Sequence, residues 1–256
     1  MAILIDPPTW PAHGHLWSHV ISDRSLEELH EFARSTGVPE RSFEGDHYDV
    51  PGERHAEMVA AGAVPVGNRE LARVLRASGL RFRKRKGERP LGRFVDGLPA
   101  VGVPHVLDVV ASAHEPLTSA GAAVVLVADP QGAMVLVQSV GRPGWAPPGG
   151  KRDPGETPRS SAVRELVEET SLRLDPAVLV PVGYERITIA EGHAVAPWAD
   201  GDNHIAVFGA RVERRVPVVP AAEDVLAAEW VDRPRLPERI ADQPWWPLVE
   251  RFLGAS

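Results

Sequence analysis

The stretch from Gly150 to Leu172 constrains this 256-residue chain more than any other. Three of its glutamates, Glu165, Glu168 and Glu169, have spacings of three and four residues from the first of them. Side chains at these spacings lie on one face of an α-helix. Glutamates that share a face repel each other unless a cation lies among them. The spacing therefore predicts a helix that presents three carboxylates, facing away from the core, to a divalent cation.

The flanking residues predict where this helix begins and what it buries. Thr157 suits the N-cap and Pro158 the first helical position, where its missing N–H costs nothing. Residues 145–156 are rich in Gly and Pro, which indicates a tight loop before the helix. The face expected to pack on the core comprises Val163, Leu166, Val167 and Thr170.

Magnesium is the cation that this pattern favours. It prefers oxygen ligands and is commonly shared between protein carboxylates and substrate phosphates. It would neutralise phosphate charge and lower the pKa of an attacking water; Mn²⁺ could substitute. A solvated acidic helix face is the alternative, but it would explain the glutamates and not the remaining residues of the segment.

The complete segment resembles the Nudix box. In that motif a Gly and a Glu are followed by Arg-Glu, an aliphatic residue, a Glu pair and a Gly, and every fixed position matches except the last Gly, which is Ser171. Serine in the left-handed conformation common after a helix would cost about 1 kcal/mol or shift the cap. The resemblance implies an α/β fold of the Nudix type, an α/β/α sandwich with a mixed sheet, and a hydrolase acting on acid anhydrides.

The resemblance also implies roles for the acidic residues. Glu165 and Glu169 would be the principal metal ligands, and Glu168 a third ligand or the base that orients water, which makes Glu168 and Glu169 the catalytic candidates. In many relatives a further acidic residue before the last strand completes the metal site. Glu223 is the candidate here, with Asp224 as the alternative.

The residues around the loop are expected to bind substrate or fix the loop. The candidates for contact with substrate and its phosphates are Trp145, Gly149, Gly150 and Lys151. Glu156 and Arg164 can pair across the junction of loop and helix and are expected to be structural.

The pattern of strands and helices divides the chain into three parts: a small α/β domain in residues 1–85, a connector in residues 86–117 and the Nudix-type domain in residues 118–256. In the last part, strands are expected at residues 122–128, 134–139, 180–189, 204–212 and 228–231, with a hairpin turn at 129–132 and a closing helix at 245–252. In the first part, a strand is expected at residues 2–5 and helices at 25–36, 53–61 and 69–78. In the connector, residues 106–113 are expected to be helical.

The N-terminal part resembles an uncharacterised bacterial domain family through Asp6-Pro7-Pro8, Trp17-Ser18-His19 and His47-Tyr48-Asp49-Val50. This resemblance implies no activity. Asp6, His19, His47 and Asp49 could form a second metal or acid–base site, although their spacing matches no established metal motif. Ordinary capping, turn or buried hydrogen-bonding roles are the alternative.

Composition excludes several classes of function. The absence of cysteine excludes disulfides, thiolate metal sites and a cysteine nucleophile. The formal charge of −7 argues against nucleic acid as a partner, despite the basic run at residues 81–86, which we interpret as a solvated connector or a contact for phosphates. The sequence lacks an apolar run of membrane-spanning length, and we expect a cytoplasmic protein without a membrane partner.

The leading hypothesis is therefore a magnesium-dependent Nudix pyrophosphohydrolase. Its substrate would be a nucleoside diphosphate linked to another moiety, of the ADP-ribose, nucleoside triphosphate or dinucleotide type. The partner would be this small nucleotide, with a homodimer left open. The alternative is a nucleotide-sensing binding protein of the Nudix fold, whose N-terminal domain relays the signal.

Overall fold

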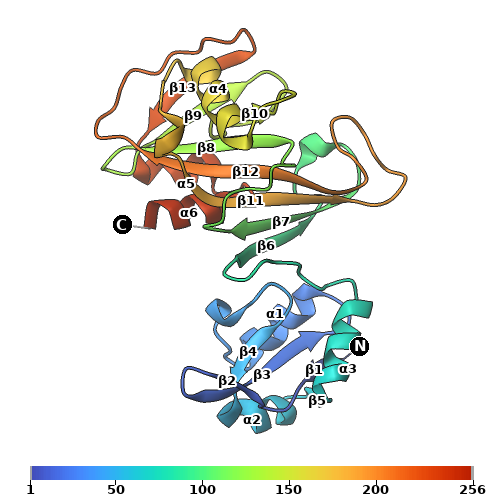
Figure 1. Ribbon diagram of the computed structural model, residues 1–256. Coiled ribbons are helices and arrows are strands. Elements are labelled where there is room, and N and C mark those ends of the chain that lie inside the picture. The colour runs from blue at the N-terminus through green and yellow to red at the C-terminus, as the bar shows by residue number, and fades with distance from the viewer. Residues whose placement is uncertain (1, 255–256) are drawn as a thin grey trace. The chain divides into compact units, whose positions relative to one another are not determined.

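The chain folds into two compact units, residues 1–85 and 86–256 (Figure 1). The computed structural model describes residues 2–254. Both units are of the α/β class, as the sequence predicts, and each has its own sheet and hydrophobic core. Within residues 2–254, every helix is too short or too polar to cross a membrane.

A five-stranded sheet with three helices forms the N-terminal unit. Its strands are β1 (Ile3–Ile5), β2 (Trp10–Ala12), β3 (His15–Ser22), β4 (Tyr48–Pro51) and β5 (Val64–Pro65). Its helices are α1 (Leu26–Ser35), α2 (His55–Ala60) and α3 (Asn68–Ala77), with 3₁₀ turns at Glu40–Ser42 and Gly52–Arg54. The strand order is β2-β3-β1-β5, in which β1 and β2 pair with different parts of β3, and β4 also pairs with β3.

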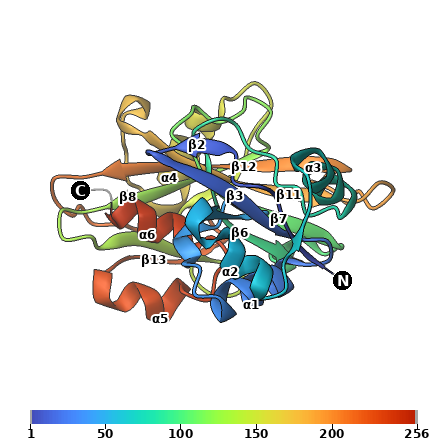
Figure 2. The ribbon, with the colours of Figure 1, turned by 90° about the horizontal axis from the view of Figure 1, so that it is seen from below.

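Both faces of this small sheet are covered. Ile3 and Ile5 of β1 join the core cluster formed with α1 and α2, whereas Leu4, which points to the opposite face, packs with Leu71 and Leu75 of α3. Figure 2 shows α1 and α2 on one side of β3 and α3 on the other. The three expected helices are thus confirmed.

An eight-stranded mixed sheet organises the C-terminal unit. Its strands are β6 (Arg89–Val95), β7 (His105–Ala111), β8 (Ala122–Ala128), β9 (Met134–Ser139), β10 (Gly149–Lys151), β11 (Val180–Ile189), β12 (Gly201–Arg211) and β13 (Val225–Val231). The order is β13-β9-β8-β12-β11-β7-β6, and β10 pairs with the start of β8. The β8–β12 pair is parallel and the other pairs are antiparallel.

Helices cover both faces of this sheet, which makes the predicted α/β/α sandwich. The helices are α4 (Pro158–Thr170), α5 (Leu236–Ile240) and α6 (Trp246–Gly254), and 3₁₀ turns lie at Pro99–Val101, Pro176–Val178 and Arg233–Arg235. Val125 and Val127 of β8 pack in the cluster of α4, whereas Leu126 packs in the cluster of α5 and α6. Figure 1 shows α4 on one side of the sheet and α5 and α6 on the other.

Residues 86–117 differ from the expected connector. They contain β6 and β7, which extend the main sheet beyond β11. The prediction of a helix at residues 106–113 is wrong, because this apolar run forms β7, with Val109 and Val110 buried. A short continuous apolar run suits a buried strand as well as a helix, and only its pairing with β11 decides between them.

Both ends of α4 follow the sequence prediction. Thr157 is the N-cap and accepts a hydrogen bond from the backbone N–H of Ser160, whose hydroxyl accepts one in return from the Thr157 N–H. Pro158 is the first helical residue. Ser171 ends the helix in the left-handed conformation, with φ of 60°. A glycine would adopt this conformation without the steric cost of a Cβ atom.

We predict that Ser171→Gly stabilises the C-terminal unit. The variant relieves the left-handed strain but loses the hydrogen bond from the Ser171 hydroxyl to the Val219 carbonyl, so the net gain should be about 0.5–1 kcal/mol. Urea unfolding measures it. Ser78→Gly is the matched control, because Ser78 also ends a helix and donates to a backbone carbonyl but has φ of −68°. A loss of stability in Ser171→Gly as large as in Ser78→Gly would contradict the prediction.

Candidate active site

Helix α4 lies close against strand β10, and two of the three residues of this strand are glycines. The Gly149 N–H donates a hydrogen bond to Glu169 Oε2 at 2.8 Å. A Cβ atom on Gly150 would lie 2.5 Å from Glu165 Oε1, and one on Gly149 would lie 2.5 Å from the Ala123 carbonyl oxygen. A larger residue at Gly150 would therefore push the Glu165 carboxylate away from the strand, and one at Gly149 would push β10 away from β8.

Arg164 fixes the geometry between the loop and the helix. Its guanidinium donates to Glu156 at 2.9 Å, to Glu165 at 2.9 Å and to Glu168 at 2.8 Å. A further bond of 2.9 Å reaches the carbonyl of Lys151 in β10. The hydrogen bond to Glu156 is the main cause that raises the pKa of Arg164, and it lowers the pKa of Glu156. The predicted pairing of Glu156 with Arg164 is thus present in the structure.

The three glutamates are not equally exposed, although the sequence predicts that all three face outward. Glu169 is 6% exposed, the side chain of Glu165 is 13% exposed and that of Glu168 is 49% exposed. The outward orientation is therefore wrong for Glu169, because β10 covers it. Burial raises the pKa of Glu169 to about 7. The hydrogen bond from the Gly149 N–H acts in the opposite direction and lowers this pKa.

The segment before β13 brings a further carboxylate toward α4. The backbone N–H groups of Val219 and Ala221 donate to the carbonyls of Thr170 and Glu168, which fastens this segment to the end of the helix. The negative charge of Asp224 is among the influences that raise the pKa of Glu169. Glu223 is exposed in the same turn.

The donor set at α4 has the chemistry that magnesium requires. All candidate ligands are carboxylate oxygens, and Glu169 is a buried acid without an arginine or lysine bonded to it within residues 2–254. The ligand atoms of Glu165, Glu168 and Glu169 do not converge within 4.8 Å of one another in the described chain, and Arg164 bonds two of them. A cation would compete with Arg164 for those two carboxylates.

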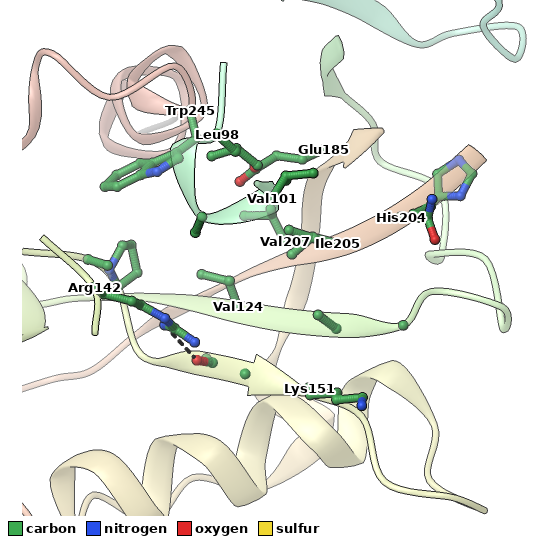
Figure 3. A pocket seen from close by; sticks show the side chains of 18 of the residues that line it. Leu98, Val101, Val124, Arg142, Lys151, Glu185, His204, Ile205, Val207 and Trp245 are labelled. Atoms are coloured by element: carbon green, nitrogen blue, oxygen red, sulfur yellow. Dashed lines mark hydrogen bonds between the residues drawn. The ribbon is translucent and has the colours of Figure 1, made fainter. Parts of the chain in front are cut away.

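A cavity of about 670 Å³ lies on the other side of β10. The residues of the loop and of β10 that line it include Arg142, Trp145, Gly149, Gly150, Lys151 and Arg152. Figure 3 shows Arg142 and Lys151 on the β10 side, with Leu98, Glu185 and Trp245 across from them. The cavity therefore combines cations on one side with apolar and aromatic groups on the other, and it includes Trp145, Gly149, Gly150 and Lys151 of the expected substrate contacts.

Two lining residues were missed by the sequence analysis. Arg142 donates to the Gly149 carbonyl at 3.2 Å, and its charge acts on both Glu165 and Glu169. A lone arginine in a Gly- and Pro-rich turn just before the motif was the available signal. Glu185 is 5% exposed in the middle of β11, and burial raises its pKa to about 7. An acidic residue in an apolar strand was its signal.

A mixed sheet lies between helices, and the helix that carries the glutamates packs against Gly149 and Gly150 of β10. This is the arrangement of a Nudix domain. The NUDIX domain model matches residues 118–252, and the chain belongs to this family of hydrolases, whose members act on pyrophosphate bonds. A second model, of a family described as a protein of unknown function (DUF4031), matches residues 3–78.

Individual relatives match parts of the chain. An octanoyltransferase of Myxococcus xanthus is 34% identical over 146 residues, which are 54% of this chain and 37% of that protein. The chain thus spans little more than a third of that relative's length. Among solved structures, a Bacillus subtilis pyrophosphohydrolase has 18% identity and a TM-score of 0.44, covering 59% of this chain and 90% of its own. A C. elegans Ap4A hydrolase has 21% identity and a TM-score of 0.40, covering 52% and 96%.

We predict that Glu185→Gln changes how stability depends on pH. The folded-state pKa of Glu185, about 7, lies above the value of about 4.5 in the unfolded chain, so the wild type loses stability as the pH rises from 4.5 through 7. The amide does not titrate, so between pH 5 and pH 8 the variant should gain up to about 3 kcal/mol relative to the wild type.

Urea unfolding of both proteins at several pH values measures this difference. Glu191→Gln, at an exposed glutamate, controls for the change from carboxylate to amide. A difference between Glu185→Gln and the wild type that is the same at pH 5 and pH 8 would mean that the folded protein keeps Glu185 ionised throughout.

Proposed function

We propose that this protein is a magnesium-dependent pyrophosphohydrolase that cleaves a phosphoanhydride bond in a nucleoside diphosphate linked to another moiety. One observation carries the proposal. The same glycine pair, Gly149 and Gly150, contacts the carboxylates of Glu169 and Glu165 on one side and lines the cavity on the other. A phosphate bound in the cavity against this strand would therefore lie close to both carboxylates.

The lining of the cavity supports a nucleotide as the substrate class. Arg142 and Lys151 supply cationic groups for a pyrophosphate, and Trp145, Trp198 and Trp245 supply aromatic surface for a base. A volume of about 670 Å³ lies within the range of small-molecule sites. Burial keeps Glu185 largely protonated below pH 7, so its carboxyl can donate a hydrogen bond to an acceptor on the ligand.

Different side chains of the protein would bind the phosphates, orient the carboxylates and accept a proton. Lys151 and Arg142 would bind the phosphates, and Arg164 would orient Glu165 and Glu168. Glu168, the most exposed of the three glutamates, would accept the proton of the attacking water. The water oxygen bonds to phosphorus, the bond from phosphorus to the bridging oxygen breaks, and that oxygen leaves with the second product. Magnesium held by Glu165, Glu169 and a carboxylate from the segment before β13 would neutralise phosphate charge and acidify the water.

We predict that Glu169→Gln abolishes magnesium-dependent turnover with the fold intact. The amide oxygen can still accept the Gly149 N–H, but it supplies no negative charge for the cation, so kcat should fall by about 10³-fold or more. Anion-exchange chromatography of the products from ADP-ribose, a dinucleotide polyphosphate and a nucleoside triphosphate measures turnover and ranks the substrates.

Glu191→Gln, the same chemical change at an exposed position, should retain activity. Full turnover in a correctly folded Glu169→Gln protein would refute the assignment of this carboxylate.

We propose Asp224, in place of the initially favoured Glu223, as the fourth carboxylate of the site. Its charge acts on Glu169, and its backbone carbonyl accepts the N–H of Val140, which anchors the turn. Asp224→Asn should therefore raise the magnesium concentration needed for half-maximal turnover about tenfold. Glu223→Gln is the matched variant one residue away and should stay within about twofold of the wild type. The reverse order of effects would assign the role to Glu223.

A nucleotide sensor is the second candidate function. The observation in its favour is that Arg164 bonds Glu165 and Glu168, and that the three carboxylates do not converge among the residues described. Calorimetry with ADP-ribose in millimolar magnesium distinguishes the two functions. Binding without any product after long incubation supports the sensor, whereas nucleotide release supports the hydrolase.

A further inference from the structure

The N-terminal unit contains a cluster of imidazole and carboxylate groups that the proposed hydrolase does not use. One ligand atom each from His19, His47 and Asp49 lies within 4.8 Å of the others. Among residues 2–254, no other three His, Asp or Glu side chains converge in this way. We propose that these three side chains bind a divalent transition-metal ion, with zinc the best match to their donor atoms.

Strand pairing brings the three residues together. His19 of β3 and Asp49 of β4 are direct partners in an antiparallel pair, so their side chains lie on the same face of the sheet. His47 lies just before β4, two residues from Asp49, and its Nε2 lies 3.4 Å from Asp49 Oδ1. Residues 28 positions apart in the sequence thus converge because the register of β3 and β4 requires it, and the rings of His19 and His47 lie 5.0 Å apart.

Each imidazole is oriented by a buried carboxylate. His19 Nδ1 lies 2.9 Å from Asp6 Oδ2, and Asp6 also accepts the backbone N–H of His19. His47 Nδ1 lies 2.5 Å from Asp46 Oδ1. Asp6 and Asp46 are 1% and 2% exposed. A carboxylate on Nδ1 fixes the tautomer that leaves Nε2 as the metal ligand, and metal-binding histidines typically have such a partner.

Asp46 is itself held in place by the basic run that follows the last helix of this unit. It accepts the backbone N–H of Phe82 at 2.6 Å and lies 3.5 Å from the Arg81 guanidinium. Asp46 Oδ2 therefore binds the basic run, and Asp46 Oδ1 binds His47. This arrangement orients the His47 ring and leaves the carboxylate of Asp49 to face both imidazoles.

The distances from Asp49 to the two imidazoles suit an ion better than they suit direct hydrogen bonds. Asp49 Oδ1 lies 3.4 Å from His47 Nε2 and 3.7 Å from His19 Nε2. Hydrogen bonds between nitrogen and oxygen are shorter, at about 2.7–3.2 Å. In a tetrahedral zinc site with bonds of about 2.0–2.1 Å, neighbouring ligand atoms lie about 3.3–3.5 Å apart. Shifts of a few tenths of an ångström would bring these distances to the values of such a site.

The donor types select the class of metal. Two imidazole nitrogens and one carboxylate oxygen favour zinc, cobalt, iron or manganese over magnesium, which prefers oxygen alone. The cluster is open to solvent on one side, since the side chains of His19, His47 and Asp49 are 22%, 17% and 38% exposed. Three protein ligands and an accessible fourth position are typical of catalytic zinc sites, in contrast to closed structural ones.

The experiment uses the full chain with Glu165→Gln and Glu169→Gln, so that the carboxylate site of the Nudix domain does not contribute. Calorimetric titration with Zn²⁺ should give one equivalent, and Co²⁺ should give visible d–d absorption bands in the same stoichiometry. X-ray absorption at the zinc edge should show imidazole scattering. In this background, His19→Gln, His47→Gln and Asp49→Asn should each weaken binding about a hundredfold, and Asp6→Asn about 10–100-fold.

His15→Gln is the matched control. His15 lies on β3 with its Nδ1 3.1 Å from Glu53, so it is a histidine paired with a carboxylate but lies outside the cluster. Its zinc affinity should equal that of the background protein. Circular dichroism identifies any variant that fails to fold, and Asp49→Asn, at the most exposed ligand, then carries the test. Absence of binding in the background protein, or equal affinity in folded Asp49→Asn and His15→Gln, would overturn the proposal.

Discussion

The candidate active site depends on the guanidinium of Arg164. This one group bonds Glu156 in the loop, Glu165 and Glu168 in α4, and the carbonyl of Lys151 in β10. The planar fork of arginine can satisfy several acceptors at fixed angles, which the compact ammonium of lysine cannot do. Without this cation the partly buried carboxylates would repel one another, and the contact of α4 with β10 would lose its orientation.

The parts that the sequence predicts well are those determined by residues close together in the chain. The cap at Thr157, the start of α4 at Pro158 and the left-handed conformation of Ser171 each depend on residues within one helical turn of that position. Strands β8, β9 and β11 have the predicted bounds because each is an apolar or alternating run between turn residues. The motif similarly determines the position of Glu165 against Gly150, since only the intervening loop must close.

The parts that the sequence analysis missed depend on contacts between distant segments. β7 is a strand because β11, about 70 residues further on, offers an edge to pair with, and β6 then pairs with β7. Glu185 was overlooked for the same reason, since it reaches the cavity only through the pairing of β11 with β12. The outward orientation expected for Glu169 failed because helical periodicity places a residue on a face but does not say which strand will cover that face.

Sheet register also explains why the histidine cluster could be suspected but not argued from the sequence. Spacing within one helix or loop produces recognisable metal motifs, whereas ligands that meet across β3 and β4 have no fixed spacing in the chain. The chemistry of the two candidate sites then differs in kind. The Nudix site offers only oxygen donors and suits a hard cation, while the cluster offers two imidazoles and suits a softer one. Because their preferences differ, the two sites could each select a different metal from the same solution, and neither need compete for the ion of the other.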